Sequence, residues 1–420
     1  MYYTLFSDLE GNLIKAPDLY FLGRSGSQWV EPEEGDLILL PEGSSLTMMP
    51  GHHPVGLNSN NEAELREKTE NGAVIATACL LPQGFTRTLL PAAVSPPDSA
   101  QIPILGYTAL AGRDGAIFAA AVPTDDHHKW HPRHYNLPFL EDLVHQRLRQ
   151  FPANRILRQL AHCSLHYSCY TAQNIFMQRW EGGIPTTPSC NARCLGCISE
   201  SHIQTFSPQE RLSFVPALEE VVEVGLHHLQ GAEESIVSFG QGCEGDPCTN
   251  SALIARAISK MRTETDRGSI NCNTNAGNFS GVKEMVDAGL DAMRVTFLSA
   301  IEKDYIAYHC PINYKLQDVI DSMRYAHDQG VFVSLNLLTM PGFTDSEEQV
   351  EKLLLLVKEV GIPMIQLRNL NLDPDFFFNA IPLRSKALGV RKMMEELTRA
   401  RVKLASYSHP AQRGKGLLKA

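Results

Sequence analysis

Residues 188–197 read P-S-C-N-A-R-C-L-G-C, which places Cys190, Cys194 and Cys197 in a C-x3-C-x2-C spacing. Three thiolates this close together can hold three irons of a cubane 4Fe–4S cluster and leave the fourth iron open. Structural zinc sites use paired C-x2-C spacings, and the chain has no second pair of that kind. Three clustered disulfide cysteines would be odd in number and geometrically cramped. The spacing therefore predicts an iron–sulfur cluster whose open iron binds a small molecule.

Around these cysteines, apolar runs of strand length alternate with amphipathic stretches of helix length. We expect strands at 235–240, 269–274, 291–297, 331–338 and 364–370, and helices at 208–225, 250–263, 280–288, 315–329 and 346–360. Ser207 and Pro208 suit the N-cap and first turn of the first of these helices. A further strand before the cysteines brings the total to about six units. The pattern predicts an α/β fold, a partial (β/α)6 barrel with its active site on the rim formed by the strands' carboxyl ends.

The first part of the chain has short β-rich runs separated by turns, and Asp114-Gly115 is typical of a tight hairpin turn. A stretch of helical periodicity follows at residues 138–180. We therefore divide the chain into four parts. These are an N-terminal mostly-β accessory domain (1–136), a helical bridge (137–175), the partial barrel (176–403) and a tail (404–420).

Composition excludes several classes of protein. The 37 basic and 47 acidic residues give a net charge of −10, which disfavours nucleic acid as a partner. The N-terminus has no basic region followed by an apolar one, and no apolar run is long enough to span a membrane. Ten cysteines without a secretion signal predict a protein of the reducing cytoplasm, with ligand or redox roles for its thiols.

The cysteine motif, with Asn191 and Arg193 inside it, resembles that of the radical S-adenosylmethionine (SAM) superfamily, and the resemblance covers about residues 176–400. Members usually have an aromatic residue just before the third cysteine, where this chain has Gly196. The resemblance implies an oxidoreductase with two cofactors, a 4Fe–4S cluster and SAM. The cluster's three catalytic cysteine ligands are Cys190, Cys194 and Cys197. It also implies that SAM is cleaved reductively and that hydrogen is abstracted from a substrate inside the barrel.

The resemblance also implies cofactor contacts at successive strand ends. After the second strand, Gly245-Asp246-Pro247 is similar to the family's Gly-Glu-Pro element, which receives the amino group of SAM. Glu244 is the competing acid, and the register stays open at this point. The remaining implied contacts are Thr274 and Asn275 after the third strand, Thr296 after the fourth and Asn336 on the fifth. Without the resemblance, polar residues of this kind are also common as satisfied strand ends.

Arg368 is a charged residue within the otherwise apolar sixth strand. An arginine that points into a barrel is costly unless an anion pairs with it. A substrate carboxylate or phosphate is one candidate partner, and a solvated or salt-bridged strand end is the alternative.

The other cysteines are Cys79, Cys163, Cys169, Cys243, Cys248, Cys272 and Cys310. Two interpretations stay open for them: buried free thiols, or ligands of an auxiliary iron–sulfur cluster such as some members of the family carry. Residues 125–135, D-D-H-H-K-W-H-P-R-H-Y, suit a polar interdomain loop, with a metal site as the alternative.

The expected partners are an unidentified substrate in the barrel and, as the resemblance implies, a reductant such as a flavodoxin or ferredoxin. One alternative function is SAM-dependent methyl or group transfer to RNA or protein. The other is a non-catalytic electron carrier, which the glycine-acid element G-C-E-G-D-P at 242–247 disfavours.

Overall fold

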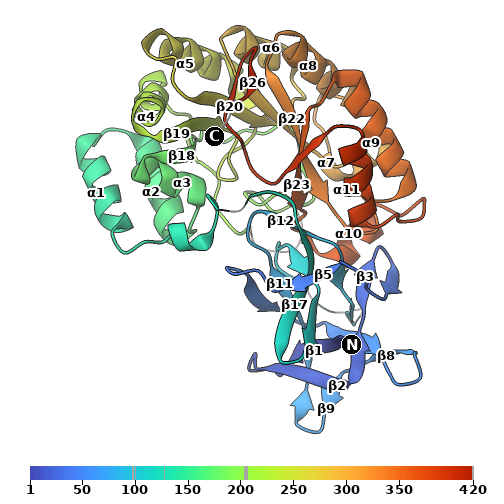
Figure 1. Cartoon of the computed structure of the whole chain (residues 1–420). Helices are drawn as coiled ribbons and strands as arrows, with labels where there is room; N and C mark the ends of the chain where they lie inside the picture. Colours follow the sequence, from blue (N-terminus) through green and yellow to red (C-terminus); the bar gives the residue numbers. More distant parts are fainter. Residues whose placement is uncertain (97–98, 100, 127, 203–206, 419–420) are drawn as a thin grey trace.

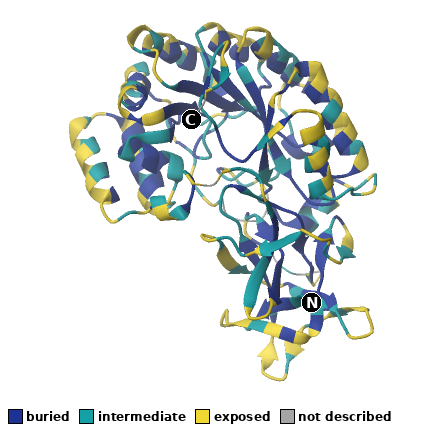
Figure 2. Cartoon of the chain, viewed as in Figure 1, coloured by how far each residue is buried: buried dark blue, intermediate teal, exposed yellow. Residues whose placement is uncertain are grey.

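The computed structural model describes residues 1–96, 99, 101–126, 128–202 and 207–418. A curled sheet with helices on its outside forms the larger part of the molecule, and a smaller β-rich part lies against one end of it (Figure 1). Strands of the larger part are buried, and the outer faces of its helices are exposed (Figure 2). Within the described residues, none of the helices combines the length and apolar character needed to span a bilayer.

Seven parallel strands form the curled sheet, and their order in space follows their order in the chain. They are β18 (Arg179–Gly183), β19 (Glu233–Phe239), β20 (Ser269–Thr274), β21 (Ala292–Phe297), β22 (Phe332–Thr339), β23 (Met364–Asn369) and β24 (Lys403–Ala405). This confirms the predicted partial barrel, with β18 leading into the cysteine loop. The short β24 adds a seventh strand that the sequence pattern did not indicate, because three residues of mixed polarity carry no periodic signal.

The helices outside the sheet are α4 (Leu218–Gly231), α5 (Ser251–Glu264), α6 (Phe279–Asp287), α8 (Leu316–Asp328), α9 (Glu347–Val360) and α11 (Val390–Arg399). Shorter ones are α7 (Glu302–His309), α10 (Pro374–Ala380) and the 3-10 turns η1 (Pro132–His134) and η2 (Pro247–Asn250). Strand residues such as Val295 and Leu335 pack with helix residues such as Val282 and Val319 in one buried core. Because side chains alternate along a strand, the neighbouring positions face the barrel interior.

The prediction of a helix from residue 208 is wrong, because α4 begins only at Leu218. Pro216 disfavours helical geometry at the residue before it, so a helix cannot run through this point without strain. The segment before it has another role: the backbone N–H of Leu212 donates to Cys243 O (2.7 Å). Ser207 therefore caps no helix; its Oγ accepts from the N–H of Ser201 (2.6 Å).

The N-terminal part is antiparallel throughout its described pairings, which confirms a mostly-β region. Asp114 and Gly115 link two of its strands with positive φ angles of 48° and 80° and form the predicted hairpin turn. Its longer strands are β1 (Tyr3–Ser7), β2 (Leu13–Phe21), β7 (His53–Leu57), β11 (Ile75–Leu80), β16 (Leu110–Arg113) and β17 (Ala116–Pro123). The shorter ones are β3 (Gly23–Ser25), β4 (Gln28–Val30), β5 (Leu37–Leu39), β6 (Ser45–Met48), β8 (Ala63–Leu65), β9 (Lys68–Thr69), β10 (Gly72–Ala73), β12 (Phe85–Arg87), β13 (Leu90–Pro91), β14 (Ala93–Val94) and β15 (Tyr107–Thr108).

Three helices connect the two parts, as the periodicity predicted: α1 (Leu140–Gln150), α2 (Arg155–His166) and α3 (Tyr170–Met177). Their apolar faces join the same core as the barrel helices, and they lie beside β18 at the first edge of the sheet (Figure 1). They therefore cover an edge that would otherwise expose unpaired backbone groups. After the barrel, β25 (Ala411–Gln412) and β26 (Gly416–Leu417) form a small hairpin.

A buried arginine joins the N-terminal part to the rim of the barrel. Arg87 donates from Nη1 to Tyr107 O (3.1 Å) and from Nη2 to Thr339 O (3.1 Å) and Leu370 O (2.9 Å). Its backbone N–H donates to Asn369 Oδ1 (2.9 Å). Burial lowers the pKa of Arg87 to about 9, and no carboxylate of the described residues forms a salt bridge with it. The guanidinium therefore joins the parts through neutral carbonyls.

Residues 125–135 form a polar loop between the two parts, although His127 lies outside the described residues. Asp125 accepts from the backbone N–H of Ser406 (3.0 Å) and pairs with Nε2 of His409 (2.8 Å). Tyr407 donates to the backbone carbonyl of Asp126. These contacts attach the loop to the segment that follows β24.

Candidate functional site

One cavity of about 570 Å³ opens at the carboxyl ends of the barrel strands, and this volume lies in the usual range of ligand sites, about 300–1,000 Å³. It is lined by all the site residues that the sequence suggested: Cys190, Cys194, Cys197, Glu244, Gly245, Asp246, Thr274, Asn275, Thr296, Asn336 and Arg368. Residues 80–85 and 105–106 of the N-terminal part also line it. The fold thus gathers the residues in one place and covers them with a second part of the chain.

The cysteine loop is held against the turn that follows β19. The N–H groups of Gly245 and Asp246 donate to Thr187 O (2.7 Å) and Ser189 O (2.9 Å). A Cβ atom at residue 245 would lie 1.8 Å from Ser189 O, so this close approach requires glycine. On its other side the loop pairs with the end of α7, where Leu195 N–H donates to Tyr308 O (3.0 Å).

The three thiols are free and half-buried. Burial raises the pKa of the Cys190 thiol to about 12, with a further contribution from the Asp246 carboxylate, and burial raises the pKa of Cys194 well above its ordinary value. A metal that binds these groups would therefore displace protons from them.

Two side chains that the sequence did not indicate contact the thiols. Nδ1 of His309 lies 3.4 Å from Sγ of Cys194, and Nη2 of Arg211 donates to Sγ of Cys197 (3.7 Å). Burial lowers the pKa of His309 to about 3, so its ring is neutral. Neither residue lies in a motif, and α7, which carries His309, was not among the expected helices.

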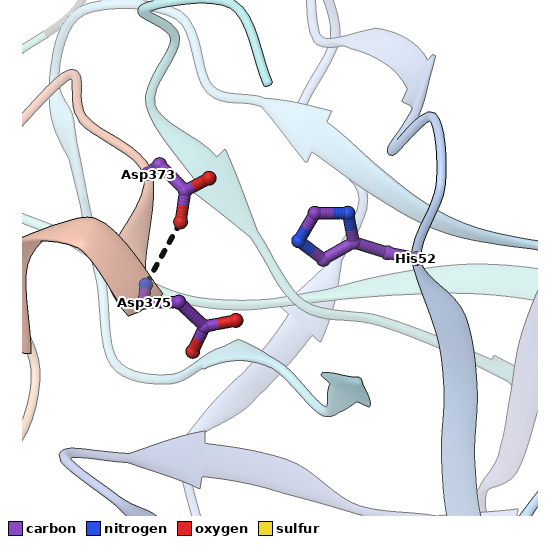
Figure 3. A group of neighbouring side chains, drawn as sticks. All are labelled: His52, Asp373 and Asp375. Atoms are coloured by element: carbon purple, nitrogen blue, oxygen red, sulfur yellow. Dashed lines mark hydrogen bonds between the residues drawn. The ribbon is translucent and has the colours of Figure 1, made fainter. Parts of the chain in front are cut away.

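The spread of the thiols is wider than a single metal ion requires. Among the described residues, three ligand atoms lie within 4.8 Å of one another only at His52, Asp373 and Asp375 (Figure 3). Sulfur ligands about 2.3 Å from one zinc ion would meet that limit easily. The thiols are thus not gathered around the position of a single ion in this structure.

The group in Figure 3 lies where the N-terminal part meets α10. Asp373 caps α10 by accepting from the N–H of Asp375 (2.8 Å), and Asp375 pairs with Arg24 (2.5 Å). Nδ1 of His52 lies 3.1 Å from Pro50 O. Of these contacts, the Arg24–Asp375 pair joins the two parts.

Glu244 and Asp246 have different surroundings, and Glu244 has the more crowded carboxyl. Its Oε2 accepts from Thr186 N–H (2.6 Å), Thr186 Oγ1 (2.9 Å) and Thr187 N–H (3.2 Å). Its Oε1 accepts from the N–H groups of Gly240 (2.7 Å) and Gln241 (3.1 Å). Both oxygens are therefore occupied, and the carboxyl links the start of the cysteine loop to the end of β19.

Asp246 retains capacity to accept another hydrogen bond. Its Oδ1 accepts from Thr274 Oγ1 (2.6 Å) and Cys248 N–H (3.0 Å), and its Oδ2 accepts from Asn275 N–H (2.6 Å). A carboxylate has about four acceptor positions, so one position on Oδ2 is free. Asp246 is thus the acid able to receive a donor from the cavity.

The predicted polar residues at the next strands divide into two groups. Thr274 and Asn275 fix Asp246, and Asn275 also donates from Nδ2 to Asn191 Oδ1 of the cysteine loop (2.6 Å). Thr296 and Asn336 line the cavity, and within the described part of the chain Oδ1 of Asn336 is buried without a hydrogen-bond partner.

The glycine before the third cysteine also has a structural cause. A Cβ at Gly196 would lie 2.9 Å from the hydroxyl of Tyr308 and 3.1 Å from Asn371 O, so a larger side chain would require both neighbours to shift. Tyr308, from α7, lines the cavity at this point. An aromatic ring is therefore present, but it comes from another element.

The remaining cysteines are free thiols. Cys79, Cys163, Cys243, Cys248 and Cys272 are buried, and Cys169 and Cys310 are half-buried. Sγ of Cys163 accepts from Nε2 of Gln159 (3.6 Å). Within the part of the chain that the structure describes, none of them belongs to a group of three ligand atoms within 4.8 Å.

Sequence comparison identifies the family of the barrel domain. Residues 184–354 match the model of the Radical SAM superfamily. Residues 184–354 therefore form a radical SAM domain. No curated protein matches it in sequence.

Solved structures also match part of the chain. SuiB of Streptococcus suis bound to the precursor peptide SuiA is 14% identical, with 64% of this chain and 61% of SuiB covered and a TM-score of 0.38. Methylornithine synthase (PylB) is 14% identical, with 62% of this chain and 76% of that chain covered and a TM-score of 0.36. The chain thus spans about three fifths of the length of SuiB.

Radical SAM enzymes use a 4Fe–4S cluster and SAM, and these are the cofactors of this domain. The residues present fit both groups. Three free thiols suit three irons, the free acceptor position of Asp246 suits an ammonium group, and the unpartnered Oδ1 of Asn336 suits a hydroxyl or amine donor.

Proposed function

We propose that the chain is a radical SAM enzyme in which Cys190, Cys194 and Cys197 bind a 4Fe–4S cluster and the fourth iron binds SAM. The observation that carries the proposal is the convergence, in one cavity, of three free cysteines with an acid that keeps an acceptor position free. When bound, these cofactors supply one-electron chemistry: reductive cleavage of a carbon–sulfur bond of SAM and hydrogen abstraction from a substrate.

The chain's own residues position and protect the cofactors. Asp246 accepts a hydrogen bond from the amino group of SAM, and Thr274 and Asn275 hold its carboxylate in place. Glu244 fixes the entry to the cysteine loop. Asn336 and Thr296 are the remaining polar contacts toward SAM.

The N-terminal domain, residues 1–136, covers the cavity and excludes water and oxygen from it. Residues 80–85 and 105–106 supply this cover. A reactive carbon radical survives only where competing reactants are kept out. The bridge (137–175), the barrel (176–403) and the tail (404–420) complete the proposed division, with β24 (Lys403–Ala405) carrying the barrel sheet two residues past the boundary at 403.

The proposed partners are a substrate inside the barrel and a one-electron reductant such as a flavodoxin or ferredoxin. The ten cysteines are all free, which favours a reducing compartment such as the cytoplasm.

The test is anaerobic reconstitution of the full chain with iron and sulfide, followed by dithionite, SAM and chromatography. We expect 5′-deoxyadenosine as the product. S-adenosylhomocysteine or methylthioadenosine instead would favour methyl or group transfer, and no SAM-derived product from a fully loaded cluster would favour an electron carrier and contradict the proposal.

Cysteine variants test the ligand assignment separately from turnover. Cys194→Ala should lose most of the cluster absorbance, because one of three iron ligands is missing. Cys169→Ala is the matched control, since this half-buried thiol lies at the N-cap of α3, outside the cysteine motif. Equal iron content in the two variants would refute the assignment.

A further inference from the structure

The interior face of the barrel is polar where many barrels are apolar. On adjacent strands, inward positions carry Arg294 on β21, Asn336 on β22 and Gln366 on β23, and Glu181 of β18 is buried among them. Burying such groups costs free energy unless each finds a partner. Their partners therefore indicate what the interior is built to receive.

Arg294 is largely satisfied within the protein. Its Nη1 donates to Gln366 Oε1 (2.7 Å) and Ser408 Oγ (2.8 Å), and its Nη2 lies 3.8 Å from Oε1 of Glu181. The same Glu181 oxygen accepts from the hydroxyls of Ser238 (2.7 Å) and Ser408 (2.9 Å). Glu181, the one acid of this group, is therefore already engaged by Arg294 and two serine hydroxyls.

Arg368 lines the cavity and has an unused edge. Its Nη1 donates to Ser406 O (2.7 Å) and to Gln83 Oε1 (3.3 Å) of the N-terminal part. Among the described residues, no atom accepts from its Nε or Nη2, and no carboxylate forms a salt bridge with it. The Nε and Nη2 hydrogens of a guanidinium are parallel and match the two oxygens of a carboxylate.

The charges of this region do not balance. Arg294 and Arg368 provide two positive charges, and Glu181 provides one negative charge at 3.8 Å from Arg294. Burial lowers the pKa of Arg368 to about 10, with a further contribution from Arg294, yet the group stays cationic at neutral pH. An uncompensated cation in a region of low dielectric favours an anionic ligand.

We propose that the substrate carries a carboxylate, which binds in two-point contact to the Nε–Nη2 edge of Arg368, with Arg294 adding positive charge beneath it. This inference rests on the proposed function, because it takes the cavity to be the substrate site. A carboxylate fits better than a phosphate dianion, because Arg294, Arg368 and Glu181 leave one positive charge uncompensated, which one negative charge balances.

The size and cover of the cavity make the bound part of the substrate small. About 570 Å³ must hold the cofactors and the substrate together. Gln83 contacts Arg368 from the N-terminal part, so that part closes over the carboxylate end. Arg368 and the cysteine loop line the same cavity, and Asn371, three residues after Arg368, approaches Gly196 of that loop, so the carboxylate would bind in the cavity that also holds the cofactors.

The test uses the full chain reconstituted with cluster and SAM, and mass spectrometry of compounds retained from a mixed panel. The panel contains small aliphatic carboxylates and amino acids, the methyl ester of each, and matching alkyl phosphates. We expect retention of one or more acids over their esters, with binding about 10- to 100-fold weaker in Arg368→Gln. Arg256→Gln, at an exposed arginine on α5, is the matched control and should bind as the parent does.

Each contrary result overturns the inference. Equal binding of acids and esters, retention of no acid, or preference for phosphates would exclude a carboxylate site. Arg368→Lys keeps the charge but not the two-donor edge, so binding as tight as in the parent would exclude two-point contact. Equal loss of SAM affinity in Arg368→Gln would assign the residue to the cofactor instead.

The inference and the proposed function can fail separately. A loaded chain that does not cleave SAM contradicts the proposed function, whatever it retains from the panel. A chain that cleaves SAM but shows no Arg368-dependent preference for acids contradicts only the carboxylate site. Circular dichroism and iron content of each variant show whether it folds and loads.

Discussion

Glu244 and Asp246 are two residues apart, yet the fold uses their carboxyl groups differently. Glu244 accepts five hydrogen bonds from its own and the preceding loop, and Asp246 accepts three and keeps a position free. The first carboxyl maintains the loop, and the second is available to a ligand. Substitution of Glu244 should therefore disturb the loop, whereas substitution of Asp246 should weaken ligand binding.

The first prediction concerns Asp246→Asn. The amide keeps an oxygen for Thr274 but loses the negative charge that faces the cavity, so SAM affinity should fall about 10- to 100-fold while iron content stays near the parent's. Equilibrium dialysis with labelled SAM measures this. Asp266→Asn, at an exposed aspartate, is the control, and equal affinity in both variants would argue against Asp246 as the SAM contact.

The second prediction concerns His309, whose neutral ring contacts Sγ of Cys194 (3.4 Å). A hydrogen bond to a ligand sulfur stabilises the more negative, reduced cluster and raises its potential. His309→Phe should lower the midpoint potential on the order of 50 mV, because one such bond is worth about 1 kcal/mol. A redox titration followed by electron paramagnetic resonance measures the shift; an unchanged potential in a loaded variant would remove His309 from this role.

At the scale of elements, the strand–helix alternation was predictable because parallel strands buried on their outer face leave long apolar runs between amphipathic helices. The start of α4 was not, since Pro216 disfavours a helix through this point, and Arg211 and Leu212 before it contact Cys197 and Cys243 instead. The positions of Asp246, Thr274 and Asn275 followed from strand ends. The roles of His309, Arg211 and Tyr308 did not, because their contacts with the cysteine loop arise only from tertiary packing.

The third prediction concerns the packing of α4 on β18. Burial lowers the pKa of His228 to about 4, and its Nε2 lies 2.8 Å from Trp180 O. The unfolded chain binds a proton at this residue below about pH 6.5, whereas the folded chain does so only near pH 4. As the pH falls from about 6.5 to about 4, the free energy of unfolding should therefore decrease by about 1.4 kcal/mol per pH unit.

Thermal unfolding of the parent and of His228→Gln, at neutral pH and near pH 5, measures this contribution. Acidification should lower the midpoint temperature of unfolding more in the parent than in the variant, because the glutamine amide does not titrate. Identical losses in the two proteins would show that this imidazole does not titrate on unfolding.

At the scale of the whole molecule, the N-terminal part reaches the barrel through buried polar contacts as well as apolar ones. Arg87 is fully buried and donates to carbonyls of both parts, and Gln83 reaches Arg368 in the cavity. The cover over the cavity is therefore attached close to the site. A loosened cover should expose the cluster before the barrel itself unfolds.

The fourth prediction concerns Arg87→Gln. Loss of these hydrogen bonds leaves buried carbonyls unsatisfied, at a cost of about 2–4 kcal/mol. We expect faster hydrogen exchange at residues 80–87 and faster loss of cluster absorbance in air. Arg113→Gln is the control, because its exposed pairing with Asp114 contributes little. Unchanged exchange in Arg87→Gln would show that this residue does not hold the cover.

The central claim is that the cysteine loop holds a cluster with one open iron that binds SAM. Electron paramagnetic resonance of the dithionite-reduced full chain, recorded with and without SAM, tests it most directly. The account predicts that SAM changes the g-values of the reduced cluster, because it becomes a ligand of one iron. Identical spectra at saturating SAM, from a fully loaded cluster, would contradict it.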